Sequence, residues 1–122
     1  MQYDKIARSY KAQSVQTASP GKLVLMLLDG CLRFTAAARK AFDEEEFTKR
    51  NEDINNNLIR AQNIVTELQS SLDMSVPGDL LGTLYRLYDY VMHNLQQANL
   101  NKEVKPIDEA DKVISELREA WA

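Results

Sequence analysis

Side chains suited to chemistry are scarce in this sequence, which holds one histidine, His93, and one cysteine, Cys31. Helical bundles that bind two metal ions use paired Glu-x-x-His motifs, which His93 alone, on the polar side of its helix, cannot supply. Cys31 lies between Leu27 and Leu32 on the helical wheel, so we expect a small core residue rather than a nucleophile. The stretch "SPGKL" lacks the spacing of a phosphate-binding loop and follows no strand. We therefore predict no enzymatic activity, no metal and no cofactor.

The composition is that of an ordinary globular chain of 122 residues, long enough for one domain with one hydrophobic core. Hydrophobic residues make up 44% and charged residues 27%, and the net charge of −3 lacks the basic excess typical of nucleic-acid binding. A single cysteine forms no internal disulfide, which suits a reducing compartment, and the N-terminus has no secretory signal. The longest apolar run, residues 23–28, is far shorter than the roughly 20 residues that span a membrane. We predict a cytoplasmic protein that neither binds nucleic acid nor inserts into membranes.

Proline and glycine mark where the helices of this chain begin and end. The first helix is expected to start with Ser19 as N-cap and Pro20 in its first turn, and to run to about Phe42. The acidic run at residues 43–46 then makes the turn into a second helix. Apolar residues three or four positions apart give that second helix one buried stripe, made of Ile54, Leu58, Ala61, Val65, Leu68 and Leu72.

A third helix is expected to follow "DMSVPGD", with Asp79 as N-cap, and to end near Leu100. A fourth helix starts at Pro106 and reaches the C-terminus. Long helices joined by short loops are typical of an up-down bundle. The sequence therefore predicts an all-α fold with one domain over residues 1–122, in which residues 18–122 form an antiparallel four-helix bundle.

Two of the expected helices carry unusually wide apolar surfaces. At about 100° per residue, apolar side chains cover roughly 260° of the first helix and roughly 160° of the tyrosine-rich third helix. A short N-terminal segment, residues 1–17, is expected to pack on the bundle through Tyr3, Ile6 and Tyr10 and to cover part of this surface. The remainder is either absorbed by the packing of the bundle or faces a protein partner.

Several stretches resemble one known family. Residues 9–34, "SYKAQSVQTASPGKLVLMLLDGCLRF", contain a tyrosine, a short linker, a Ser-Pro-Gly helix start, a leucine-rich turn and an Asp-Gly pair. This order resembles the N-terminal signature of the flagellar secretion chaperones, the flagellin-binding FliS family. "IRAQNIVTEL" at residues 59–68, "LYDYVMHNLQQAN" at residues 87–99 and the terminal "EAW" look like the same family. Leu28 departs from the pattern, because the family often has an aromatic residue there.

The resemblance implies a binding protein rather than an enzyme. Members of that family hold newly made flagellin in the cytoplasm by its C-terminal segment and prevent its premature polymerisation. They then deliver flagellin to the export gate of the flagellar type III system. Flagellin and an export-gate component are therefore the partners that the resemblance implies.

On the third helix we predict a groove for the flagellin segment. Leu81, Tyr85 and Met92 lie at the outer edge of the apolar arc and are expected to form the groove wall. Tyr88 and Leu95 lie one step inward and are expected to form its floor. The apolar arc of the third helix is thus predicted to be partly core and partly partner surface.

Three further residues complete the predicted site. Gln96 lies beside the apolar arc and is expected to pair with main-chain amides of the bound segment, because such groups need partners once water is excluded. Ile59, the one apolar residue on the far side of the second helix, is predicted as a separate contact. Tyr10 carries over from the family motif as the residue of the N-terminal segment that packs near the groove.

A second interpretation is a homo-oligomeric helical scaffold or adaptor without a peptide cargo. In that case the same apolar strip pairs with itself across a two-fold axis. The strip also allows a homodimer of the free chain. Light scattering with and without a flagellin C-terminal peptide separates the two interpretations, because only a chaperone forms a one-to-one complex with that peptide.

Overall fold

The computed structural model describes residues 20–122, and four α-helices make up most of this range. They are α2 (Pro20–Ala41), α3 (Phe47–Ser70), α4 (Leu80–Asn101) and α5 (Lys105–Trp121). No strand occurs within residues 20–122, so the predicted all-α fold is confirmed. The predictions for Ser19 and for the segment 1–17 lie outside the described residues.

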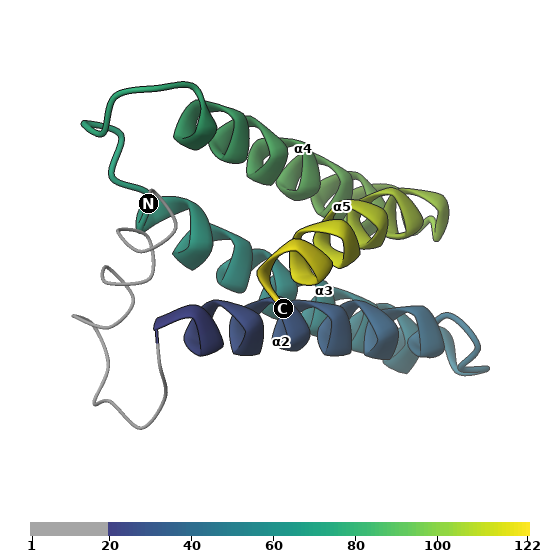
Figure 1. Cartoon of the computed structure of the whole chain (residues 1–122). Helices are drawn as coiled ribbons and strands as arrows, with labels where there is room; N and C mark the ends of the chain where they lie inside the picture. The colour runs from purple at the N-terminus through teal and green to yellow at the C-terminus, as the bar shows by residue number, and fades with distance from the viewer. Residues whose placement is uncertain (1–19) are drawn as a thin grey trace.

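The helices form a closed ring in which each packs against two neighbours: α2 on α3, α3 on α4, α4 on α5, and α5 on α2. Figure 1 shows α2 and α4 on opposite sides of the ring, with α5 in front. Contacts across one interface fix the helix directions, since Gln69 of α3 bonds to α4 at Tyr85 while Asn55 bonds to Asn99. The two helices are therefore antiparallel, and the predicted four-helix bundle is confirmed.

Glu46, the last residue of the acidic turn, caps α3. Its carboxylate accepts hydrogen bonds from the backbone N–H groups of Lys49 at 2.7 Å and Thr48 at 3.0 Å. These bonds satisfy two donors that the start of a helix otherwise leaves unpaired, and they lower the pKa of Glu46. The turn predicted at residues 43–46 is confirmed, and one of its acids has a specific capping role.

Helix α4 is capped more strongly at its end than at its start. Asp79 precedes the helix as predicted, but its backbone is helical (φ −94°, ψ −13°) and its side chain makes no capping bond. A capping side chain normally reaches the first turn from an extended backbone. At the other end, Lys102 adopts the left-handed conformation (φ 53°), and its ammonium donates to the Asn99 carbonyl at 2.7 Å.

The core runs through the centre of the ring and includes the whole apolar stripe predicted on the second helix. Its members come from all four helices, and none is more than 7% exposed. The buried apolar residues are Val24, Leu28, Cys31, Ala38, Ala41, Ile54, Leu58, Ala61, Val65, Leu68, Leu72, Leu81, Leu84, Tyr88, Val91, Leu95, Ala98, Ile107, Ala110 and Ile114.

The wide apolar arc of α2 is covered only in part. Leu27 and Phe34 are half-buried against the core, but Met26 remains 55% exposed. The bundle packing therefore absorbs most of this arc and leaves an apolar edge at the surface.

Charged residues join α2 to α5. The hydroxyl of Thr35, which is only 1% exposed, donates to the Asp111 carboxylate at 2.6 Å. Arg39 binds the same carboxylate at 2.9 Å. Nearer the other end, Arg118 binds Asp29 at 2.5 Å. This interface is thus fixed by groups whose partners are all present within the chain.

Cys31 is a core residue, as the sequence predicted. It is 0% exposed, and its sulfur lies 4.0 Å from the Ala61 carbonyl oxygen. Burial, with a smaller contribution from the negative charge of Asp111, raises the pKa of the Cys31 thiol from 9.0 to about 12. The neutral thiol is therefore strongly favoured in the folded protein.

The raised pKa of Cys31 predicts a loss of stability in alkali. The unfolded thiol ionises near pH 9 and the folded one near pH 12, so the stabilising effect is complete below pH 9 and is lost as the pH rises. The free energy of unfolding should fall by about 1.4 kcal/mol per pH unit across this window. Denaturant unfolding measured at about pH 8 and about pH 10.5 gives the drop in the free energy of unfolding between the two pH values. This drop should be larger by about 2 kcal/mol in the wild type than in Cys31→Ala. Equal drops in the two proteins would contradict a buried neutral thiol.

Candidate functional site

Tyr85, Met92 and Gln96, three of the predicted groove residues, lie along the α3-facing edge of α4. Tyr85 is 41% exposed, Gln96 is exposed, and Met92 is half-buried against the core. Gln69 of α3 bonds to the backbone of Tyr85 at 3.1 Å, which identifies this edge as the one beside α3. Met92 and Gln96 follow Tyr85 by two and three helical turns and therefore share its edge.

The predicted positions of Leu81, Tyr88 and Leu95 are wrong. They are 2%, 2% and 0% exposed and belong to the core, whereas the sequence placed Leu81 in the groove wall and the other two in its floor. The reason is that α3 and α5 both pack on α4 and together enclose the centre of its apolar arc. A bound segment would reach these three side chains only if the bundle opened.

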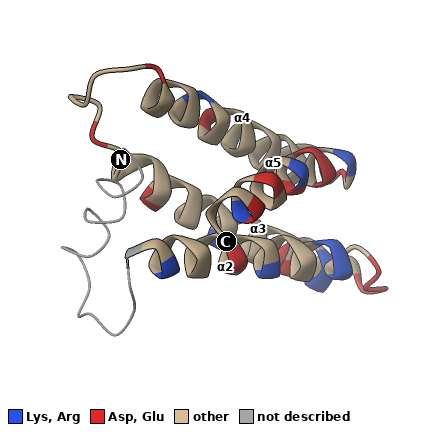
Figure 2. Cartoon of the chain, viewed as in Figure 1, with Lys and Arg blue, Asp and Glu red and all other residues tan. Residues whose placement is uncertain are grey.

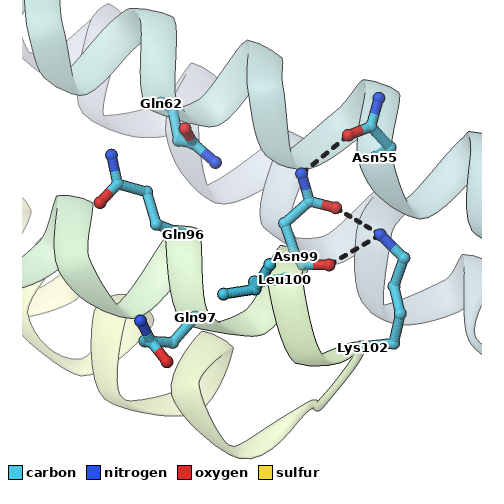
Figure 3. Close-up of a pocket in the computed structure, with 7 residues that line it drawn as sticks. All are labelled: Asn55, Gln62, Gln96, Gln97, Asn99, Leu100 and Lys102. Carbon is cyan, nitrogen blue, oxygen red and sulfur yellow. Dashed lines mark hydrogen bonds between the residues drawn. The ribbon is translucent and has the colours of Figure 1, made fainter.

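An open depression of about 610 Å³ lies between α3 and α4 (Figure 3). Figure 3 shows Gln62 of α3 and Gln96 of α4 on opposite walls. Side-chain amides supply most of the lining, and we call the depression the amide groove. Its lining residues are Asn55, Gln62, Gln96, Gln97, Asn99, Leu100 and Lys102.

Hydrogen bonds join the two helices on either side of the middle of the amide groove. At one end, Asn99 donates to the side-chain oxygen of Asn55 at 2.8 Å. Toward the other end, Gln69 donates to the Asp89 carboxylate at 2.7 Å. The middle of the interface, where Gln62 lies, has no such bridge among the described residues. Here the helices pack without a polar link.

Gln62 holds an unused donor at the middle of the amide groove. Its side-chain nitrogen Nε2 is buried and has no hydrogen-bond partner within the described part of the chain. A buried donor without a partner costs roughly 1–3 kcal/mol, and such groups are rare in folded proteins. An acceptor would therefore stabilise this nitrogen, which is covered and unpaired in the free protein.

Exposed apolar side chains lie at the amide groove and further along the α3-facing edge of α4. Leu100 is 77% exposed, and Tyr85 and Ile59 are each 41% exposed. Ile59 lies one helical turn from both Asn55 and Gln62, which line the groove. Ile59 therefore borders this groove, whereas the sequence predicted a separate contact.

This site has the chemistry of peptide binding. Side-chain amides both donate and accept, so they match the alternating N–H and C=O groups of a peptide backbone. The apolar rim offers area for side chains of the bound segment. Within residues 20–122, no three metal-ligating side chains gather into a metal site, and His93 is an exposed residue of α4. None of these helices has the length and apolar character required to cross a bilayer.

Reasoning from the sequence missed Asn55, Gln62 and Asn99. A signal was present for the two asparagines, because amides are concentrated in "NEDINNN" at residues 51–57 and "NLQQANLN" at residues 94–101. In antiparallel neighbouring helices, the start of one lies beside the end of the next, so the two stretches meet. Tyr10, the remaining predicted residue, lies outside the described part of the chain.

Comparison with known proteins gives one consistent result. The family model described as "Flagellar protein FliS" matches residues 2–122. The chain is 36% identical to the flagellar secretion chaperone FliS of Bacillus subtilis, covering 93% of this chain and 80% of that protein. It is 32% identical to FliS of Salmonella typhimurium (88% of this chain, 78% of the relative) and 34% identical to FliS of Campylobacter jejuni (99% and 91%).

Proposed function

The chain belongs to the family of the flagellar protein FliS, and we propose that it is a cytoplasmic chaperone that binds the C-terminal segment of flagellin. In this role it keeps flagellin from polymerising early and delivers it to the flagellar type III export apparatus. The relatives that it matches are named flagellar secretion chaperones, which supports a binding role rather than an enzymatic one.

The observation that carries the proposal is the buried, unpaired donor of Gln62 in an open groove with an apolar rim. An extended flagellin segment along the groove offers backbone carbonyl oxygens to this nitrogen and to the neighbouring amides. Its apolar side chains contact Tyr85, Ile59 and Leu100, which are exposed in the free protein. Binding thus satisfies a donor and covers apolar surface at the same time.

The energetics of such a complex require several contacts. Ordering a disordered segment costs roughly 2–5 kcal/mol or more. Each apolar side chain that becomes fully buried returns roughly 1.5–3 kcal/mol, and a hydrogen bond adds about 1 kcal/mol. A segment that contacts only one rim residue would not bind, so we propose that flagellin runs along the length of the groove.

Titration calorimetry with a flagellin C-terminal peptide tests the proposal, and Gln62→Leu is the informative variant. The wild type should form a one-to-one complex, and light scattering should show one chain with one peptide. Gln62→Leu should weaken binding about three- to tenfold, because the peptide loses a donor. Its melting temperature should not fall, since an unpaired buried donor is removed.

Asn63→Leu is the matched control, because Asn63 is the exposed neighbour of Gln62 on α3. Its affinity for the peptide should equal that of the wild type. Unchanged affinity in Gln62→Leu would remove Gln62 from the site. A wild-type chain that ignores the peptide and self-associates would instead support the homo-oligomeric scaffold.

A further inference from the structure

Helix α2 is basic, although the whole chain carries a net charge of −3. It holds four lysines and arginines and one acid, and Figure 2 shows the basic segments spaced along its length. Part of this charge is neutralised at the interface with α5, where Arg39 binds Asp108 and Asp111. The one acid of α2, Asp29, is itself paired with Arg118 of α5. Arg33 belongs to neither group of ion pairs and is exposed.

Arg33 and an arginine of α3, Arg60, both lie at the α2–α3 interface. A Cβ atom built on Gly30 would lie 3.2 Å from Ile64 and 3.6 Å from the Arg33 guanidinium, so the guanidinium lies over this interface. From the other helix, the Arg60 guanidinium lies 5.7 Å from the centre of the Phe34 ring. Two guanidinium groups therefore lie close to one apolar strip.

Neither guanidinium has a carboxylate partner within residues 20–122, where the ion pairs involve other cations. The residues one turn before and after Arg60 on α3 are asparagine or isoleucine. The acid one turn before Arg33 is Asp29, whose carboxylate is already bound to Arg118 of α5. The two arginines are thus available to carboxylates from outside the chain.

The surface between the arginines is apolar. Phe34 and Ile64 are half-buried beneath it, and Met26, two turns before Arg33 on α2, is 55% exposed. Guanidinium groups bind carboxylates through paired hydrogen bonds, and the groove between two packed helices accepts a third helix. We infer that this surface binds an acidic amphipathic helix of a partner protein. We call it the arginine seam, made of Met26, Arg33, Phe34, Arg60 and Ile64.

Charge complementarity selects this occupant. The N-terminal segment of the chain carries Lys5, Arg8 and Lys11 against a single acid, Asp4, so its charge has the same sign as the arginine seam. Nucleic acid is poorly matched, because its affinity depends on many cations and the seam has two in an acidic chain. The flagellin segment is assigned to the amide groove, whose lining holds amides and one lysine. The arginine seam is therefore a second site, and it does not depend on the proposed cargo.

The test uses a synthetic amphipathic helix of about 20 residues built from alanine, leucine and glutamate, long enough to be helical alone. Its binding to the full chain is measured by fluorescence titration at low and high salt. Arg33→Glu combined with Arg60→Glu should weaken binding at least tenfold at low salt, and high salt should reduce the difference. The matched control is Lys105→Glu combined with Lys112→Glu, both on α5. It changes the net charge of the chain by the same amount and should bind the peptide like the wild type.

Four results would overturn the inference. The first is equal binding by both double variants, and the second is equal binding of a control peptide in which lysine replaces every glutamate. The third is equal binding of a single-stranded DNA of matched charge, and the fourth is self-association that involves the arginines. If the glutamate double variant melts at a lower temperature than the wild type, Arg33→Gln combined with Arg60→Gln replaces it, because glutamine keeps a polar side chain at both positions. The flagellin peptide should bind both double variants normally, and a parallel loss of flagellin binding would contradict a separate site.

Discussion

Leu95→Asp should leave no folded protein at neutral pH. Leu95 is 0% exposed in the centre of the bundle, and a carboxylate placed there loses its hydration. Burying an unpaired charge costs at least several kcal/mol, and removing the leucine contacts adds about 2–5 kcal/mol. This sum is comparable to the whole stability of a domain, which is roughly 5–15 kcal/mol. Far-ultraviolet circular dichroism and gel filtration should report an unfolded or aggregated chain.

His93→Asp is the matched control for that variant. It introduces the same carboxylate two positions earlier on the same helix, at an exposed residue. Its stability should stay within about 0.5 kcal/mol of the wild type. If Leu95→Asp melts as cooperatively as His93→Asp, then Leu95 lies in an open groove, as the sequence analysis expected for the groove floor, and its place in the core is wrong.

The helices were predictable because their buried stripes are periodic. The six apolar residues assigned to the second helix are all buried, since residues three or four apart fall on one face whatever the neighbours are. Helix boundaries followed from proline, glycine and capping residues, with α5 beginning at Lys105 rather than Pro106. The capping bond predicted for Asp79 is absent, because the backbone at Asp79 is already helical. No sequence rule fixes that backbone conformation.

The surface of α4 was less predictable than its buried face. The apolar arc gave the correct order of residues around the helix, and its outermost member, Tyr85, is exposed. The boundary between core and surface was placed one step too far inward, so that Leu81, Tyr88 and Leu95 were assigned to a groove. That boundary depends on how closely α3 and α5 approach α4, which is a property of the packed ring and not of one helix.

The amide groove depends on a register that a single helix does not contain. Asn55 and Asn99 are far apart in the sequence, and they meet because α3 and α4 run antiparallel with that offset. The unpaired state of Gln62 depends on the same offset, since a shift of one turn would change the groups that face it. Composition indicated amides in both stretches, while their geometry required the assembled bundle.

Two of the four interfaces in the ring, α2–α5 and α3–α4, differ in chemistry. Between α2 and α5, buried Thr35 and three ion pairs satisfy one another within the chain. Between α3 and α4, the polar groups are mostly neutral amides, and the buried Gln62 donor is unpaired. An interface with an unpaired donor gains stability from an incoming peptide, and one whose groups are already paired does not. This difference supports the α3–α4 interface as the place for the cargo.

Tyr85→Asp should give a folded protein that binds the flagellin peptide roughly 30-fold more weakly. Tyr85 is 41% exposed on the α3-facing edge of α4, three helical turns before Gln96 of the amide groove, so the new carboxylate stays hydrated in the free protein. In the complex, the variant lacks an aromatic contact, and the cargo covers the charge that replaces it. An aromatic residue that acts as a binding hot spot contributes about 2 kcal/mol or more, which corresponds to that loss of affinity. Thermal melting and calorimetry on the same sample measure both quantities.

Tyr90→Asp separates a groove effect from a general effect of the substitution. Tyr90 is 45% exposed on the same helix, and its hydroxyl lies 3.3 Å from Glu109 of α5, so it occupies the opposite edge of α4. The chemical change and the exposure are matched, and only the neighbouring helix differs. Tyr90→Asp should therefore bind the peptide like the wild type. If both variants bind normally, the cargo lies on another face of the bundle, and if both lose binding equally, the loss does not come from the amide groove. A Tyr85→Asp protein that unfolds would show instead that this side chain supports the core.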